Sequence, residues 1–132
     1  AGFTFTTALP PFFAHAICKS IDIVQKQLPE TQITRLNNIN YFRAAADANN
    51  IQLGESNFSS SQIQTIPVSC ARKARKLSEY LLQKKHYVQH LNYPTVAEGK
   101  ECLRISVKNS HTPEMIDKLM YYMMIYDSFE HT

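Results

Sequence analysis

The stretch Tyr87-Val-Gln-His-Leu-Asn-Tyr-Pro-Thr-Val-Ala-Glu-Gly-Lys-Glu-Cys-Leu-Arg-Ile-Ser-Val107 has the pattern of two short strands joined by a polar loop. Strand-forming residues stand at its start, and Pro94 and Gly99 mark turns in its middle. Residues 102–107 form a second strand pattern. The stretch therefore predicts a hairpin-like unit within a small sheet.

The second strand alternates between apolar and polar residues, as a strand with one buried face does. Leu103, Ile105 and Val107 would share one face, which places Arg104 on the other. A guanidinium held by a strand points in a fixed direction, and its planar fork suits a carboxylate or a phosphate. The pattern alone favours the other interpretation, a solvated strand face with a surface ion pair.

Helical patterns precede this unit. Pro10-Pro11 is expected to start a helix, which Pro29 is expected to end. A second helix is expected over residues 31–47, with Asn49-Asn50 ending it. The buried stripe expected of the first helix is Phe13, Ile17, Ile21, Val24 and Leu28. The inward residues expected of the second helix are Ile33, Leu36, Ile39, Phe42 and Ala46.

One more strand and two more helices complete the pattern. Residues 54–61 predict a loop, and residues 63–68 predict a strand whose proline suggests a sheet edge or an irregular ladder. Residues 71–85 predict a basic helix with Ala74, Leu77, Leu81 and Leu82 inward. A last helix starts at the cap Thr112 and buries Met115, Ile116, Leu119, Met120, Met123 and Tyr126. This order predicts the α/β or α+β class.

Composition limits the possible functions. The chain has 132 residues, 44% of them hydrophobic, and suits one modest globular domain. Its net charge of +3 is too small to indicate a nucleic-acid binder. Three cysteines and five scattered histidines show neither a disulfide framework nor metal-ligand spacing. The basic face of the helix over residues 71–85 is interpreted as a solvated surface.

Three segments resemble a known family. Residues 87–105 are similar to Tyr-Val-Gln-x-Leu-Asn-Tyr-Pro-Thr-Val followed by x-x-Gly-x-Glu-x-Leu-Arg-Ile in the 5-aminolevulinate synthases. Residues 2–11 resemble the family's Gly-Phe-Ile-Phe-Thr-Thr-Ser-Leu-Pro-Pro, and residues 111–115 its His-Thr-Pro-x-Met. These pyridoxal-phosphate enzymes of the α-oxoamine synthase family join glycine to succinyl-CoA, the first step of haem biosynthesis.

The resemblance implies the C-terminal part of a fold-type I pyridoxal-phosphate transferase, with a short antiparallel sheet backed by helices. Residues 1–28 would be the end of the large domain and the connecting helix. Residues 29–132 would be the C-terminal small domain. The Schiff-base lysine of the family lies upstream of the matched segments, so no catalytic residue is expected in this chain and the chain alone should be inactive.

The resemblance also implies roles for four residues. Arg104 falls on the arginine that binds the glycine carboxylate, and Thr95 on the threonine that contacts the succinyl carboxylate. Thr6 and Thr7 fall on the hydroxyl pair that reaches the pyridoxal phosphate of the other subunit, which implies a homodimer with shared active sites. Without the resemblance, strand propensity and turn chemistry would account for the three threonines.

Two alternatives stay open. Ala97-Glu98 stands where the family usually has Pro-Arg, which fits a non-catalytic relative kept as a binding or assembly subunit. The chain could also come from another α-oxoamine synthase with a different acyl-CoA, although Thr95 argues against that reading. The family implies the mitochondrial matrix or, alternatively, the bacterial cytoplasm.

Overall fold

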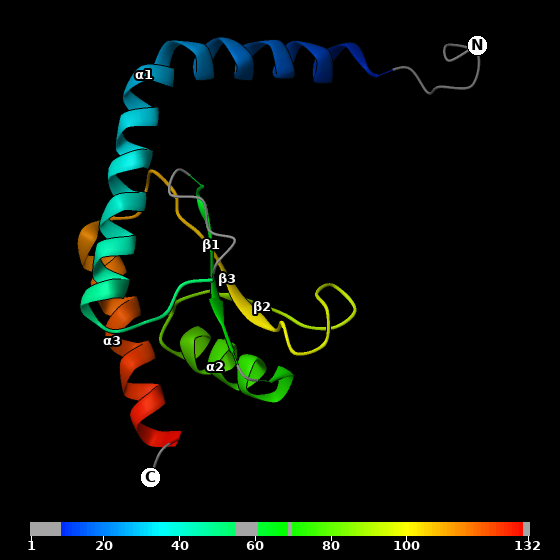
Figure 1. Cartoon of the computed structure of the whole chain (residues 1–132). Coiled ribbons are helices and arrows are strands. Elements are labelled where there is room, and N and C mark those ends of the chain that lie inside the picture. The colour runs from blue at the N-terminus through cyan, green and yellow to red at the C-terminus, as the bar shows by residue number, and fades with distance from the viewer. Residues whose placement is uncertain (1–8, 55–60, 69, 131–132) are drawn as a thin grey trace. The chain divides into compact units, whose positions relative to one another are not determined.

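The computed structural model describes residues 9–54, 61–68 and 70–130 (Figure 1). The chain divides into two compact units, Ala1–Ile33 and Thr34–Thr132. Thr6, Thr7 and most of the loop expected at residues 54–61 lie outside the described residues. The expected domain boundary between residues 28 and 29 stays a prediction.

Helix α1 runs through Pro11–Ala48 and contains Pro29, so the expected break into two helices is wrong. A proline removes one backbone hydrogen bond and crowds the preceding turn, at a cost of about 3 kcal/mol. The other hydrogen bonds of the helix persist on both sides. The Thr31 hydroxyl also donates to the carbonyl oxygens of Gln27 at 2.8 Å and Leu28 at 3.2 Å in the turn around the proline.

The expected buried stripe of the first unit is exposed instead. Its five residues, Phe13 to Leu28, have exposed fractions between 42% and 57%. Among the described residues of this unit, α1 is the single regular element, and a lone helix cannot bury its own apolar side. The stripe therefore needs a covering surface from outside this unit.

The second unit contains a three-stranded antiparallel sheet in the order β1-β3-β2 (Figure 1). Its strands are β1 (Ile63–Pro67), β2 (Gln89–Leu91) and β3 (Cys102–Ser106). Both parts of the predicted hairpin-like unit are confirmed, and β1, which carries Pro67, lies at an edge as its proline predicted. Backbone hydrogen bonds from Val107 to Gln62 and from Val68 to Glu101 extend the β1·β3 pairing at both ends.

One face of this sheet forms the core with three helices. The carboxy-terminal part of α1, α2 (Ala71–Gln83) and α3 (Pro113–Glu130) all contribute to one buried cluster with β3. Leu103, Ile105 and Val107 are at most 6% exposed, which confirms the predicted apolar face of β3. The helical residues of the cluster are Ile39, Phe42, Ala46, Leu77, Leu81, Ile116, Leu119, Met120 and Met123.

Four expected core residues are exposed: Ile33, Leu36, Leu82 and Met115. Ile33 and Leu36 lie on α1 before Ile39, the first buried residue of that helix, so there the apolar stripe continues beyond the contact. Leu82 and Met115 stand next to the buried Leu81 and Ile116, about 100° round the helix from them, and so face away from the core. The periodicity predicted the buried side of each helix but neither the length nor the width of the contact.

The helix ends follow local chemistry. The Thr112 hydroxyl accepts the backbone N–H of Met115 at 3.4 Å, and its carbonyl accepts the N–H groups of Met115 and Ile116, as expected of the N-cap. Asn50 ends α1 with φ of 56°, and the N–H of Ile51 returns to the carbonyl of Ala46 at 2.8 Å. Both boundaries were predicted correctly.

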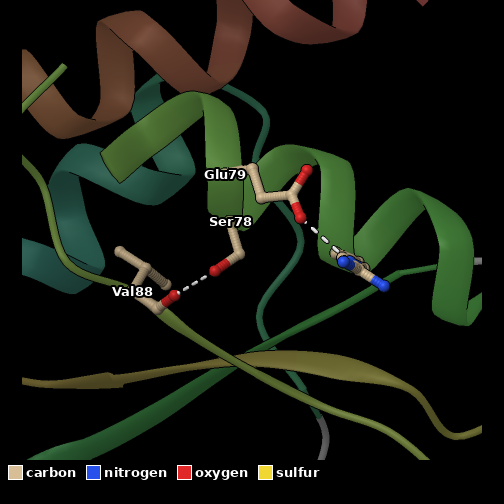
Figure 2. Close-up of polar contacts among 4 residues, drawn as sticks. Ser78, Glu79 and Val88 are labelled. Atoms are coloured by element: carbon tan, nitrogen blue, oxygen red, sulfur yellow. Dashed lines mark hydrogen bonds and ion pairs between the residues drawn. The ribbon is translucent and has the colours of Figure 1, made fainter. Parts of the chain in front are cut away.

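A side-chain contact fixes α2 to the strand that follows it. The Ser78 hydroxyl donates to the carbonyl of Val88 at 2.6 Å, as Figure 2 shows. The next residue, Glu79, pairs with Arg75 one turn earlier at 2.9 Å on the exposed side of α2, with both side chains more than half exposed. The first contact positions the residues that enter β2, whereas the second contributes little to stability.

We expect Leu103→Ala to lower the free energy of unfolding by about 2–5 kcal/mol, because the side chain is fully buried at the centre of the sheet. Ile63→Ala is the matched control, since Ile63 is 44% exposed on the opposite face, and it should cost less than about 1 kcal/mol. Urea denaturation of the chain measures both values. Equal losses in the two variants would contradict the assignment of the buried face.

Candidate anion-binding site beside the central strand

Arg104 lies at the middle of β3 on the sheet face that the helices leave uncovered. Its register partners are Thr65 on β1 and Gln89 on β2. One guanidinium nitrogen, Nη2, donates to the side-chain oxygen of Gln89. Within the described ranges no carboxylate pairs with Arg104, so the guanidinium retains donors for an anion.

Thr95 lies in the loop between β2 and β3. Its backbone N–H donates to the carbonyl of Asn92 at 2.9 Å, its side chain is exposed, and the preceding Tyr93–Pro94 peptide bond is cis. No described hydrogen bond joins Thr95 to Arg104. The structure therefore puts both residues on one strand–loop–strand unit but does not join them by a described hydrogen bond.

The same loop holds two polar side chains that sequence reasoning did not single out. Glu101 is 7% exposed, and its Oε2 has no hydrogen-bond partner among the described residues. The buried Oδ1 of Asn92 is also without a partner in this part of the chain. A buried acceptor without a donor costs free energy, so both atoms indicate where a donor from elsewhere would fit. The sequence signal is weak: a glutamate directly before an alternating strand.

A groove opens next to Arg104, at the place where the segments flanking β2 and β3 separate. Its volume is about 680 Å³. Among the described residues, five cationic side chains line it, together with His86 and His111, and no carboxylate does. We call it the basic groove. Its cationic residues are Lys84, Lys85, Arg104, Lys108 and Lys118.

The pKa values of the two histidines of the basic groove are lowered, which favours neutral imidazoles. Burial is the main cause that lowers the pKa of His86, and the charge of Lys118 lowers it further. Burial likewise lowers the pKa of His111, with a second contribution from Lys108. The His111 Nδ1 accepts the backbone N–H of Lys108 at 3.2 Å, which requires that nitrogen to be unprotonated. The lysines therefore supply the positive charge of the groove near neutral pH.

No metal centre is found in the described part of the chain: nowhere in it do three or more His, Cys, Asp or Glu side chains form a group that could hold a metal ion. Burial raises the pKa of the Cys102 thiol, which disfavours the thiolate. None of the helices described in residues 9–130 is long and apolar enough to cross a membrane.

The chain is similar in sequence to several transferases. It is 37% identical over 120 residues to the 5-aminolevulinate synthase of Rickettsia bellii, covering 90% of this chain and 28% of that protein. It is 37% identical over 120 residues to the mitochondrial enzyme of Agaricus bisporus, covering 90% and 19%. It is 34% identical over 116 residues to the 8-amino-7-oxononanoate synthase of Photorhabdus laumondii, covering 88% and 29%. No family model matches the chain.

Solved structures agree with these relatives. The 8-amino-7-oxononanoate synthase of Francisella tularensis superposes with a TM-score of 0.80 at 24% identity, over 97% of this chain and 36% of that one. The serine palmitoyltransferase of Sphingomonas wittichii has a TM-score of 0.81 at 20% identity, over 94% and 31%. The chain has the fold of the carboxy-terminal part of a fold-type I pyridoxal-phosphate transferase. As this carboxy-terminal part, it spans less than a third of the curated relatives that it matches.

The curated homologues are acyltransferases of the α-oxoamine synthase family, and they use pyridoxal phosphate. The described residues of this carboxy-terminal part offer an anion-binding guanidinium but no group that fits the cofactor itself. Every lysine described is exposed except Lys73, which is half-buried, so none occupies a closed pocket. The cofactor contacts expected of Thr6 and Thr7 fall outside the described residues.

The histidines give a pH-dependent test of the groove. The pKa values of His86 and His111 should both lie below 6.5 in the folded chain. As the pH falls through 6.5, the unfolded chain takes up protons that the folded chain does not, so stability should fall with acidification. Histidine titration by NMR measures the pKa values, and urea denaturation across the same pH range measures the stability.

Lys118→Gln should raise the pKa of His86, because it removes a nearby positive charge. Lys76→Gln is the control, since Lys76 is exposed on α2 and does not line the groove. A His86 pKa that does not change in the Lys118 variant would contradict the described placement of that lysine.

Proposed function

We propose that this chain is the carboxy-terminal part of a 5-aminolevulinate synthase, which condenses glycine with succinyl-CoA and releases carbon dioxide and CoA. The observation that carries the proposal is Arg104, a guanidinium free of carboxylate partners in the described chain and aimed from the uncovered face of the central strand. The resemblance of residues 87–105 to these synthases implies that the ligand of this arginine is the glycine carboxylate.

Arg104 binds the carboxylate of glycine in this proposal. Two parallel N–H donors hold both carboxylate oxygens, which fixes the rotation of the amino acid about its Cα. Pyridoxal phosphate, when bound, would supply the electron sink for the bond broken at that Cα. Gln89 accepts one guanidinium N–H and so holds the side chain in the direction of the uncovered face.

Thr95 contacts the carboxylate end of the succinyl group. Its hydroxyl is exposed in the loop between β2 and β3 and can donate one hydrogen bond to an anion. A polar group placed for a terminal carboxylate rejects acyl chains that lack one, because the hydroxyl would then be buried without a partner. Thr95 is therefore the residue in this chain that sets acyl-CoA preference.

The cofactor and the assembly are part of the same proposal. Thr6 and Thr7 reach the phosphate of pyridoxal phosphate in the partner of a homodimer. The exposed apolar stripe of α1, Phe13 to Leu28, supports a covering surface from the rest of the polypeptide or from a second copy. The covalent chemistry belongs to a lysine upstream of the matched segments, so the chain by itself should not catalyse the reaction.

The alternative that the relatives support is that the chain comes from another α-oxoamine synthase, which uses a different acyl-CoA. The Photorhabdus laumondii 8-amino-7-oxononanoate synthase is nearly as similar as the 5-aminolevulinate synthases. A non-catalytic relative is the third alternative, motivated by the Ala97-Glu98 pair, which is exposed in the loop. The length of the natural transcript distinguishes the non-catalytic alternative from the two enzymes, because an enzyme needs an upstream segment with the lysine.

The compartment follows the identity of the complete polypeptide. The relatives include proteins that are named as mitochondrial and others that come from bacteria. We place the enzyme in the mitochondrial matrix or, for a bacterial source, in the cytoplasm.

In the complete polypeptide, Arg104→Leu should lower kcat/KM for glycine by about a hundredfold, since charge-assisted hydrogen bonds contribute about 1.5–3 kcal/mol. Cofactor absorbance should stay unchanged, because Arg104 does not anchor pyridoxal phosphate. The control is Arg72→Leu, which removes an exposed arginine from the outer side of α2 and should have no effect. An unchanged glycine response in the Arg104 variant would remove this residue from the site.

Thr95→Val should change acyl-CoA preference rather than glycine binding. The ratio of kcat/KM for succinyl-CoA to that for butyryl-CoA should fall about tenfold, the value of one hydrogen bond to a charged group. Competition assays with the two thioesters measure this ratio. A ratio that stays the same would favour another α-oxoamine synthase.

A further inference from the structure

The basic groove collects positive charge from three separate elements. Lys84 and Lys85 come from the end of α2, Lys108 follows β3, and Lys118 lies on α3. Among the described residues none of these four lysines forms an ion pair with a carboxylate. Like charges repel, so such a group is stabilised by an anion between them.

Two carboxylates of α3 lie outside the basic groove. The Asp117 carboxylate accepts the Tyr41 hydroxyl at 2.9 and 3.0 Å, and this contact raises the pKa of that phenol. A hydrogen bond with Thr112 is the main cause that lowers the pKa of Glu114, and the charge of Lys118 lowers it further. Among the described residues, the positive charge of the groove is therefore compensated only in part, by Glu114 near Lys118.

Backbone geometry holds two of the lysines at the groove. Lys85 has a φ of 66°, a conformation that a residue with a side chain adopts at a cost of about 1 kcal/mol or more. The N–H of His86 returns to the carbonyl of Leu81 at 2.9 Å and closes the end of α2. This turn directs the chain from the helix into the wall of the groove.

Aromatic rings hold the Lys84 side chain. The Lys84 Nζ lies 5.6 Å from the ring centre of Tyr80 and 5.7 Å from that of Tyr122. The His86 and Tyr122 rings are also neighbours, with 5.7 Å between their centres. Lys84 is therefore partly ordered before any ligand arrives, which lowers the entropy cost of binding.

The inner side of the basic groove is apolar, in contrast to its rim. Five residues of the core line it: Phe42, Val88, Ile105, Ile116 and Leu119. A volume of about 680 Å³ is typical of sites for small organic ligands. An inorganic anion would use the lysines but leave the apolar side in water. The occupant that fits both parts carries adjacent anionic groups on an apolar or aromatic body.

We propose that the basic groove binds a small organic polyphosphate, with its phosphate groups on Lys84, Lys85, Lys108 and Lys118 and its aromatic body against the apolar side. Arg104 also lines the groove but is not one of the four phosphate-binding lysines of this proposal. The inference therefore does not depend on the proposed synthase activity, and its test leaves Arg104 unchanged.

Isothermal titration calorimetry with the 132-residue chain tests the proposal with three probes: adenosine triphosphate, inorganic triphosphate and adenosine. Adenosine triphosphate should bind about tenfold more tightly than triphosphate, because its ring removes some 60 Å² of apolar surface from water at about 25 cal/mol per Å². Adenosine should show no measurable binding. Equal affinity for the first two probes would overturn the proposed role of the apolar side.

The double variant Lys108→Gln, Lys118→Gln should weaken binding of adenosine triphosphate by about tenfold or more, the effect of charge-assisted hydrogen bonds. The matched control is Arg72→Gln, Lys76→Gln, which removes the same number of charges from the exposed side of α2 outside the groove. It should change the affinity by less than about twofold, because surface charges are screened by salt. Equal weakening by both variants would mean non-specific attraction and would overturn the site.

A second readout does not depend on variants. Bound phosphate should raise the pKa values of His86 and His111, since a nearby anion stabilises the charged imidazole. NMR titration of the histidines with and without adenosine triphosphate measures this change. No heat of binding at millimolar probe together with unchanged histidine pKa values would overturn the proposal.

Discussion

The alternation of side chains along β3 is the constraint on which the rest of this small domain depends. The strand is hydrogen-bonded on both sides, to β1 and to β2, and only one of its faces is covered by helices. Leu103 at 0% and Ile105 at 6% exposure fill the centre of the core. A slip of one residue would bury Arg104 and expose these side chains, so the register is strongly specified by burial.

This register links stability to chemistry. The same backbone that places Leu103 in the core turns Arg104 to the uncovered face, where it meets Gln89 and no carboxylate of the described chain. Where the segments flanking β2 and β3 separate, the core residues and the surrounding lysines form the basic groove. Both candidate anion sites therefore depend on the same sheet. The pleat of β3 sets the direction of the Arg104 guanidinium, and the elements packed around the sheet set the positions of the lysines.

The sequence correctly predicted the structural features that depend on local chemistry. The alternation at residues 102–107, the Thr112 cap and the proline in β1 specified their elements without knowledge of the partners. Pro29 misled the prediction because one lost hydrogen bond did not outweigh the remaining bonds of α1. The stripe from Phe13 to Leu28 and the end residues Ile33 and Met115 were misjudged because burial depends on what lies opposite. The basic groove combines residues far apart in sequence, and the burial of Glu101 Oε2 without a described hydrogen-bond partner depends on the surrounding fold. Periodicity along the chain cannot reveal either feature.

In the proposed function, the pleat of β3 directs Arg104 towards the carboxylate of a bound amino acid. A crystal structure of the complete polypeptide with pyridoxal phosphate and glycine tests it most directly. We expect both carboxylate oxygens of glycine within about 3 Å of the Arg104 guanidinium nitrogens, with Leu103 and Ile105 still buried on the opposite face. A glycine carboxylate held by another residue, with Arg104 turned to solvent, would contradict the account.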